Sequence, residues 1–211
     1  MENYYLLRDD VELMDLINTV NKVSNLMMDS GKDHTMFVVN SVEYILTRLG
    51  YDEHIIELGK ISALLHDIGN LTGKNDHALK SSEMSEYFLN KTTLTGYDKK
   101  RIMQAIRDHS NGEEIDTPFG AALLLADKVD FNRERVLPKG KNDSWHKNVL
   151  EIDHTEIIVE DNKVFINRLV SETFSEEMMN SWKKGIAIPM KACKYLECEC
   201  IFQCNGKIKS S

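Results

Sequence analysis

Two segments of the chain run through apolar residues almost without interruption and then end in a carboxylate. Residues 61–65 are nearly all apolar and are followed at once by His66 and Asp67, and an apolar run over 119–126 precedes Asp127. A helix that is apolar nearly all round is buried in a core. An ionised side chain there is costly unless a partner neutralises it. Two separate core helices therefore deliver carboxylates inward, and these charges require a cation, either an Arg or Lys partner or a metal ion.

Three further histidines lie where helices are expected to begin or end. Two of them each follow an aspartate that could cap a helix, and the third lies near the end of a helix predicted over 98–109. Imidazole and carboxylate groups are the usual ligands of Mn, Fe, Co, Ni and Zn. Each of these three histidines taken alone is more typical of a surface or capping residue. The His66–Asp67 pair is equally typical of a histidine held by a carboxylate in the core. Taken together the set indicates one or two metal ions that share a carboxylate; its members are His34, His66, Asp67, His77, His109 and Asp127.

Apolar periodicity predicts a mainly α first part of the chain. Glycines and prolines separate its segments, and the connections between them are short, as in a helical bundle. We expect Asp33 and Asp76 to be helix N-caps. Residues 1–137 are therefore predicted to form a helical core, with helices over 11–28, 33–49, 52–68, 76–90, 98–109 and from Pro118 onward.

The pattern changes after Pro138, which indicates a small C-terminal α/β appendage over residues 138–211. Residues 139–148 are polar and are predicted to be a surface loop. Apolar residues over 156–159 and 164–166 flank a polar turn, which is typical of a β-hairpin. A helix over 175–196, interrupted at Pro189, and a short strand over 198–203 complete the predicted appendage.

Composition narrows the class of protein. The chain has 211 residues, of which 42% are hydrophobic, enough to bury a core without disulfides. It contains no apolar run near the roughly 20 residues of a membrane-spanning helix, and no secretory pattern at its N-terminus. Its net charge of -8 argues against a generic grip on nucleic-acid phosphates. We expect a soluble cytoplasmic protein that binds neither a membrane nor a nucleic-acid polymer.

The four cysteines lie close together near the C-terminus, which is unlike a disulfide framework spread along a secreted chain. Their spacing also lacks the paired Cys-x-x-Cys knuckles of a structural zinc site. We expect reduced, small apolar side chains, with an accessory metal or redox role as the alternative. The residues are Cys193, Cys198, Cys200 and Cys204.

The histidine and aspartate motifs resemble the HD superfamily of metal-dependent phosphohydrolases, which is named for its His-Asp pair. The resemblance covers about residues 30–136, and the fold that it implies is an HD-domain helical bundle. It implies that one metal ion is held by His34, the His66–Asp67 pair and Asp127. In the dinuclear, six-ligand branch two further histidines hold a second ion, and Asp67 bridges the two. The matching segments are 33–35, 64–69, 76–78, 106–110 and 125–128.

The chain departs from one group of that branch. The cyclic-dinucleotide phosphodiesterases carry Gly-Tyr-Pro after the fifth ligand and a Lys after the His-Asp-Ile-Gly run, where this chain has Ser110 and Asn70. We therefore disfavour that group. Arg133, six residues after the last ligand, resembles the HD-type hydrolases of diadenosine tetraphosphate.

These features predict an HD-type phosphohydrolase. A metal-bound hydroxide would cleave a phosphoester or phosphoanhydride of a nucleotide-like small molecule, with His66 and Asp67 at the catalytic centre. We expect Fe, Mn, Ni, Co or Zn rather than Mg, because the ligand set is rich in histidine. The alternatives are a metal or nucleotide sensor without turnover and a purely structural helical protein.

Further residues are candidates for accessory roles. Lys74, Lys128 and Arg133, and with less weight Arg135, are candidates for holding phosphate, against the alternative of ordinary surface cations. Asp108 could orient a ligand histidine. The hairpin edge or the helix around Met178 and Met179 could form a homodimer, although we favour packing of both on the helical core.

Overall fold

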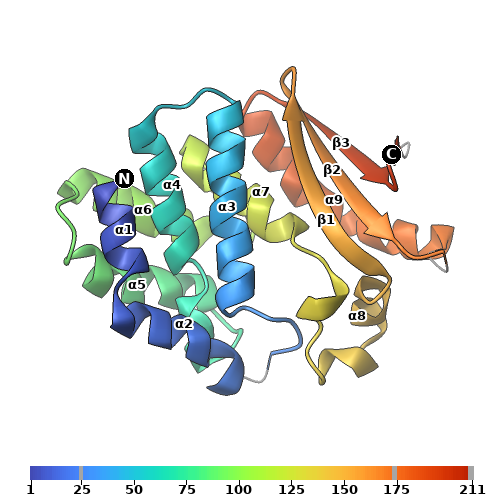
Figure 1. Cartoon of the computed structure of the whole chain (residues 1–211), viewed down its shortest axis with the longest axis horizontal. Coiled ribbons are helices and arrows are strands. Elements are labelled where there is room, and N and C mark those ends of the chain that lie inside the picture. The colour runs from blue at the N-terminus through green and yellow to red at the C-terminus, as the bar shows by residue number, and fades with distance from the viewer. Residues whose placement is uncertain (24–25, 173–174, 209–211) are drawn as a thin grey trace.

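The computed structural model describes residues 1–23, 26–172 and 175–208, and it places a body of helices beside a small sheet (Figure 1). The predicted fold class, a mainly α bundle with an α/β appendage, is confirmed. The helices are α1 (Glu2–Arg8), α2 (Val11–Val23), α3 (Lys32–Arg48), α4 (Glu53–Leu65), α5 (His77–Leu89), α6 (Gly96–Asp108), α7 (Pro118–Val129), α8 (Ser144–Val149) and α9 (Glu176–Tyr195), with short 3₁₀ turns η1 (Ile68–Thr72), η2 (Arg133–Arg135) and η3 (Gly140–Asn142).

Side-chain caps fix the starts of the two most apolar helices. The Asp52 carboxylate accepts a hydrogen bond from the Ile55 backbone nitrogen at 2.9 Å and so begins α4. Thr117 accepts one from the Gly120 nitrogen at 3.0 Å, and Pro118 follows at the first helical position of α7. Both arrangements satisfy or avoid backbone donors that a helix start leaves free. The two helices that deliver the buried carboxylates therefore have defined registers.

Several predicted helix ends are wrong. The helix predicted over 11–28 ends at Val23; residues 24–25 lie outside the described residues, and Met28 pairs with Val136 in an isolated antiparallel bridge. Gly31, not Asp33, is the N-cap of α3, because the Asp29 carboxylate binds the Gly31 nitrogen at 2.8 Å and turns the chain there.

Other corrections concern the ends and interior of later elements. The helix α4 ends at Leu65 rather than at residue 68, and the turn η1 follows it. Pro189 lies inside α9 without interrupting the helix, which packs along α7. Because a proline removes one backbone hydrogen bond, such packing can hold the helix together. The predicted loop over 139–148 contains η3 and most of α8.

The sheet has the strand order β1-β2-β3-β4. The strands β1 (Ile152–Glu160) and β2 (Lys163–Val170) form the predicted hairpin, whose turn residues Asp161 and Asn162 both have positive φ, as tight hairpin turns require. The strand β3 (Glu199–Cys204) pairs parallel to β2 after the crossover through α9, and β4 (Lys207–Ile208) pairs antiparallel to β3.

The helical body protects the outer edge of the sheet. The Val159 nitrogen of β1 donates a hydrogen bond to the Tyr44 hydroxyl at 3.3 Å, and Arg48 donates to the Val159 carbonyl at 3.1 Å. Both partners lie on α3. An edge strand otherwise presents free backbone groups that pair with other chains. These contacts also join the appendage to the helix that carries His34.

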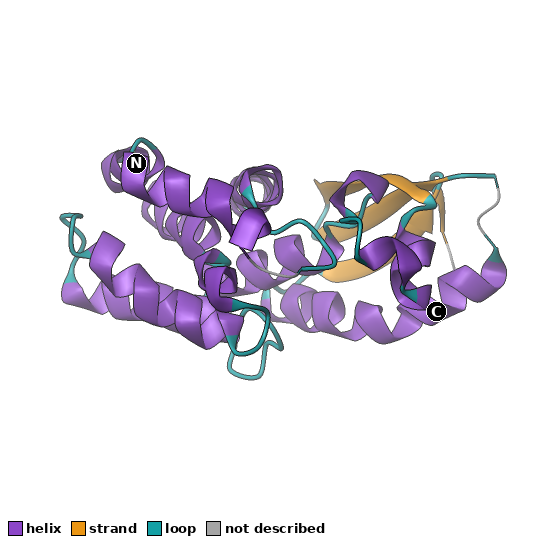
Figure 2. Ribbon diagram, turned by 90° about the horizontal axis from the view of Figure 1, so that it is seen from below, coloured by secondary structure: helices purple, strands orange, loops and turns teal. Residues whose placement is uncertain are grey.

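One hydrophobic core extends through both parts of the chain. It includes Leu58 and Phe119 of the helical body together with Val164, Ile166 and Cys193 of the appendage. Helix α9 lies along one face of the sheet and continues beside the body (Figures 1 and 2). The domain boundary at residue 137 stays a prediction, although the core does not end there.

None of the helices in the described ranges has both the length and the apolar character that crossing a membrane requires.

The turn η1 packs closely on α5, and this close packing predicts that a side chain at Gly69 destabilises the protein. A Cβ atom at Gly69 would lie 2.5 Å from the His77 carbonyl oxygen and 2.5 Å from the Ser81 nitrogen, both backbone atoms. We therefore expect Gly69→Ala to reduce the free energy of unfolding by about 1–3 kcal/mol. Gly96→Ala is the control, because a Cβ there meets no atom within 4 Å. Urea unfolding measures both, and equal stability of the two variants would contradict the prediction.

Candidate metal centre

The six predicted ligands come from the ends of five helices that meet in one place. His34 lies in the first turn of α3, and His77 begins α5. The His66–Asp67 pair follows α4, and His109 follows α6. Asp127 lies in the last turn of α7. The fold thus brings together residues that are far apart in the sequence. All of them except Asp127 are buried.

Four of the residues surround one point, which we call the first site: His34, His66, Asp67 and Asp127. The Nε2 atoms of His34 and His66 are 3.2 Å apart. The Asp67 Oδ2 atom lies 3.6 Å from His34 Nε2 and 3.7 Å from His66 Nε2. The Asp127 Oδ1 atom lies 3.4 and 3.9 Å from the same two nitrogens.

The second site consists of Asp67, His77 and His109. The Nε2 atoms of His77 and His109 are 3.2 Å apart, and Asp67 Oδ1 lies 3.5 and 3.6 Å from them. One Asp67 oxygen therefore faces each site, which is the arrangement of a bridging carboxylate. The ligand atoms of His34, His66 and Asp67, and those of Asp67, His77 and His109, form two clusters of a size that could each hold an ion.

Hydrogen bonds at the opposite ring nitrogen orient all four imidazoles. The Nδ1–H group of His66 donates to the Ala63 carbonyl at 2.8 Å. His77 and His109 donate likewise to carbonyls three residues earlier, at 3.0 and 2.5 Å. A carbonyl can only accept, so these Nδ1 atoms carry the proton and the Nε2 atoms present their lone pairs. His34 Nδ1 lies 2.7 Å from an Asp130 carboxylate oxygen, which has the same effect.

This arrangement places acceptor atoms face to face. Imidazole lone pairs 3.2 Å apart, beside carboxylate oxygens, repel one another unless a cation lies between them. Asp67 Oδ1 is buried and has no hydrogen-bond partner among the described residues. Two nitrogens that bind the same ion, each at about 2.0–2.1 Å, lie about 3.0–3.4 Å from each other. This distance matches the 3.2 Å between the Nε2 atoms in each pair of imidazoles. The residues present therefore fit divalent metal ions.

Burial keeps two of the imidazoles neutral. It lowers the pKa of His66 to about 3 and that of His77 to about 4, against the opposing effect of the Asp67 carboxylate. Burial and the Arg135 guanidinium also lower the pKa of His34, but hydrogen bonds to Asp127 and Asp130 outweigh them and raise it. Neutral imidazole is the form that binds a metal, and at His34 the metal competes with a proton.

Both site carboxylates stay ionised. Burial raises the pKa of Asp67, but nearby positive charge, including the Lys74 ammonium, lowers it well below the usual range. Burial likewise raises the pKa of Asp127, and Lys128, whose Nζ atom lies 2.7 Å from Asp127 Oδ2, lowers it well below that range. The centre therefore holds two negative charges in a buried setting.

Of the three main candidate cations, two lie beside the ligands and one lies elsewhere. Lys74 Nζ lies 3.4 Å from His77 Nε2, and Lys128 pairs with Asp127. Arg133 forms an ion pair with Asp153 of β1, and both side chains are about half exposed, at 45% and 53%. The structure thus brings the two lysines to the centre and engages Arg133 with the appendage.

Sequence reasoning missed Asp130, and the structure gives Arg135 and Asp108 other contacts than those expected. Asp130 follows Asp127 by three residues, so it extends the same face of the chain beyond α7, and this spacing was the available signal. Arg135 is a buried structural contact of Asp130, at 3.3 Å, rather than an exposed phosphate ligand. Asp108, the expected orienting carboxylate, instead accepts a hydrogen bond from Gln104 at 2.6 Å.

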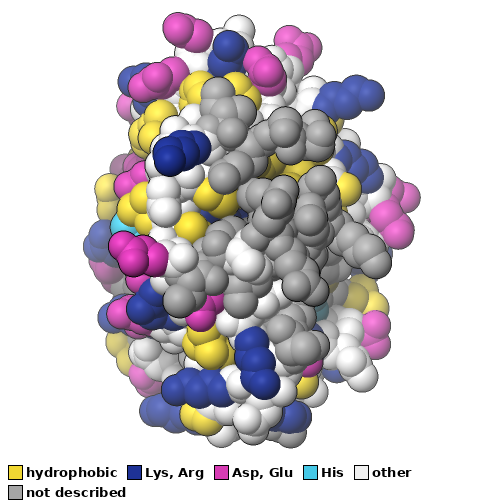
Figure 3. Space-filling view, turned by 90° about the vertical axis from the view of Figure 1, so that its right-hand side faces the viewer, with side chains coloured by type: hydrophobic (Ala, Val, Ile, Leu, Met, Phe, Trp, Pro, Cys, Tyr) yellow, Lys and Arg dark blue, Asp and Glu magenta, His cyan; other side chains and the backbone are white. Residues whose placement is uncertain are grey.

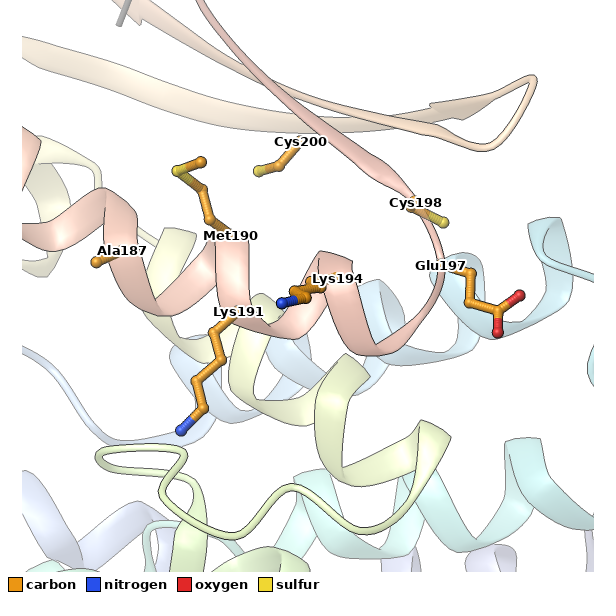
Figure 4. Close-up of a pocket in the computed structure, with 7 residues that line it drawn as sticks. All are labelled: Ala187, Met190, Lys191, Lys194, Glu197, Cys198 and Cys200. Atoms are coloured by element: carbon orange, nitrogen blue, oxygen red, sulfur yellow. The ribbon is translucent and has the colours of Figure 1, made fainter.

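A separate hollow of about 570 Å³ lies between α9 and the start of β3 (Figure 4). Met190 and Cys200 point into the space between the helix and the strand, whereas Lys191 points to the loop after α6, where it donates to the Gly112 carbonyl. The six predicted ligands do not line this hollow, so it is distinct from the metal centre. All four cysteines are free thiols, and Cys193 is buried.

Comparison with known proteins assigns the family. The HD domain model matches residues 31–161, which is more than half of the chain, and the chain belongs to this family of metal-dependent phosphohydrolases. The curated proteins give no significant match. A similar solved structure is that of a predicted HD superfamily hydrolase from an uncultured Thermotogales bacterium, with 24% identity, a TM-score of 0.44, and coverage of 59% of this chain and 71% of that one. The predicted superfamily is thus confirmed, and the six-ligand branch stays a prediction.

The low pKa values of His66 and His77 predict how the metal-free protein responds to acid. Unfolded imidazoles take up protons below pH ~6.5, whereas these two stay neutral, so the unfolded state binds more protons. Each residue should therefore lower the free energy of unfolding by about 2 kcal/mol between pH 7 and pH 5. His34, whose pKa is raised, works in the opposite direction. Ring-proton NMR of the folded protein tests this residue by residue, and a midpoint near 6.5 for either imidazole would contradict it.

Proposed function

We propose that the protein is a hydrolase that cleaves a phosphoester or phosphoanhydride of a small, nucleotide-like molecule with the help of one or two divalent metal ions. The observation that carries this proposal is the Asp67 carboxylate, which lies between two pairs of imidazole nitrogens with one oxygen directed to each pair. Membership of the HD domain family supports the reaction class.

The first and second sites would each hold one ion. Divalent ions supply Lewis acidity: they lower the pKa of water and neutralise charge on phosphoryl oxygens. The imidazole-rich ligand set favours Fe, Mn, Co, Ni or Zn over Mg, which prefers oxygen ligands. The chain contributes the fixed spacing of the ligand atoms and a buried setting in which charges interact strongly.

Lys74 and Lys128 are the residues that we propose to bind the phosphate. Each ammonium group now lies against a ligand atom, at 3.4 Å from His77 Nε2 and 2.7 Å from Asp127 Oδ2. A cation bound to His77 Nε2 would free the Lys74 ammonium to donate to a phosphoryl oxygen. Lys128 keeps Asp127 Oδ2, because Oδ1 is the oxygen that faces the first site, and its remaining N–H groups would donate to phosphoryl oxygens. Such charge-assisted hydrogen bonds orient the phosphorus atom and balance its negative charge.

Arg133 stays a candidate for a more distant part of the substrate. Its guanidinium is bound to Asp153 and about half exposed, so it lies on the surface where η2 meets β1. A planar guanidinium suits a second phosphate group, which a nucleotide-like substrate would carry. The ion pair with Asp153 would exchange for a pair with the substrate.

The charge distribution supports a small substrate rather than a nucleic-acid polymer. The net charge is -8, and on the described part of the face that carries the sheet and α9, acidic and basic side chains are interspersed (Figure 3). A polymer needs a continuous basic surface that neutralises several phosphates.

We also propose a cytoplasmic location and a homodimer. The four free thiols support a reducing compartment. Met190 and Tyr195 of α9 are partly exposed, at 49% and 39%, and they offer an apolar contact for a second copy. The side chains of Met178 and Met179, the predicted contact, lie outside the described residues.

Asp67→Ala tests the proposed function most simply. It removes the carboxylate that faces both sites, so we expect the loss of bound Mn²⁺. Hydrolysis of bis(p-nitrophenyl) phosphate should fall at least about 100-fold. Loss of a residue that only orients a metal ligand already lowers activity or metal affinity by about 10- to 100-fold. Asp15→Ala, at an exposed position of α2, is the control. Full activity of Asp67→Ala would disprove the site, and nucleotide binding without turnover by the unaltered protein would favour a sensor.

Substitution of the residues proposed to bind phosphate tests substrate binding independently of metal binding. We expect Lys74→Met and Lys128→Met to lower kcat/KM roughly tenfold or more, because each removes a charge-assisted hydrogen bond. Arg133→Ala should mainly raise KM. All three variants should keep their metal by elemental analysis. Loss of metal from Arg133→Ala would show that Arg133 is a structural residue.

A further inference from the structure

We propose that Asp130 and Arg135 form a positioning pair that serves the first site alone, so that the two sites depend on different parts of the protein. This inference rests on the proposed function, because it concerns how ions are held at that centre. It predicts that changing Asp130 weakens one bound ion and spares the other.

His34 differs from the other three imidazoles in how its tautomer is set. His66, His77 and His109 each donate to the carbonyl three residues earlier, so the local backbone orients them. His34 lies in the first turn of α3, where the Gly31 carbonyl is already bound by the Thr35 nitrogen at 2.9 Å. Its orientation therefore depends on a group that is distant in the sequence.

Asp130 is that group, and it is itself firmly held. Its Oδ2 atom lies 2.7 Å from His34 Nδ1 and 3.3 Å from Arg135 Nη1, and its side chain is only 2% exposed. Its Oδ1 atom accepts a hydrogen bond from Asn132 Nδ2 at 3.3 Å. Every neighbour is a donor, so the carboxylate accepts the Nδ1–H of His34 and leaves Nε2 free for the first site.

Arg135 connects two of the three segments that deliver the first site. Besides Asp130, it donates from Nε to the Asp29 carbonyl at 3.1 Å, and the Asp29 nitrogen donates back to the Arg135 carbonyl at 2.7 Å. The segment at Asp29 leads directly into the first turn of α3. Arg135 therefore ties the start of the helix that carries His34 to the end of the helix that carries Asp127.

The second site lies outside this network. The hydrogen bonds that orient His77 and His109 come from the Lys74 and Ile106 carbonyls, and neither involves Asp130 or Arg135. Loss of the pair should therefore disturb the nitrogen of His34 without moving the second pair of imidazoles.

Calorimetric titration of the metal-free full chain with Mn²⁺ tests the proposal. We expect two binding events in the unaltered protein. In Asp130→Ala one event should weaken by about 10- to 100-fold, while the other stays within about twofold. Asp130→Asn keeps an oxygen for His34 but loses the charge, so the same event should weaken by roughly fivefold. Asp108→Ala, which removes a carboxylate bound to Gln104, is the matched control and should change neither event.

The tautomer of His34 gives a readout that a merely structural role would not change. In nitrogen–proton NMR spectra of the metal-free protein at pH 8.5, we expect all four imidazoles to carry the proton on Nδ1. In Asp130→Ala the proton of His34 should move toward Nε2, while His66, His77 and His109 keep theirs. Should Asp130→Ala fail to fold, the titration of Asp130→Asn decides the matter.

The outcomes separate the two proposals. Binding of no Mn²⁺ by the unaltered protein would overturn the proposed function. Binding of a single ion would overturn the two-site arrangement on which the positioning pair depends. Two events in the unaltered protein, with both or neither weakened in the Asp130 variants, would overturn the positioning pair and leave the proposed function intact.

Discussion

Where the ends of five helices meet, imidazole lone pairs lie close to the carboxylates of Asp67 and Asp127, and the packing of these helices fixes that contact. His34 and His66 face each other at 3.2 Å, and so do His77 and His109, with the ionised Asp67 between the pairs. Hydrogen bonds at Nδ1 hold the rings in the tautomer that makes this contact repulsive without a cation. The fold therefore brings together ligand atoms whose charges and lone pairs a divalent cation would balance.

The fold holds this arrangement from several sides. Gly69 allows η1 to lie against α5, which keeps Asp67 near His77. The appendage contributes as well: Lys191 of α9 binds the Gly112 carbonyl in the loop after His109, and Arg48 of α3 binds the backbone of β1. Because the hydrophobic core runs through both parts, the appendage supports the centre that the helical body carries.

The sequence was sufficient for the fold class and for the six ligand positions that the fold brings together. Asp67 and Asp127 were identifiable because an ionised group directly after an apolar helix needs a partner. The spacing of Asp130 from Asp127 places it on the same face, but its role was not predictable, since that role depends on a contact with a residue 96 positions away. The parallel pairing of β3 with β2 and the unbroken helix through Pro189 likewise follow from tertiary packing, which local patterns do not encode. The position of Arg133 beside Asp153 depends on how η2 meets β1.

An anomalous-difference map from crystals grown with Mn²⁺ would show directly whether Asp67 bridges two ions. We expect peaks within bonding distance of Asp67, one on each side of the carboxylate and about 3.5–4 Å apart. The peak beside Oδ2 would be shared with His34 and His66. A map without a peak at Asp67, from crystals in which the four imidazoles keep their present positions, would disprove the metal centre.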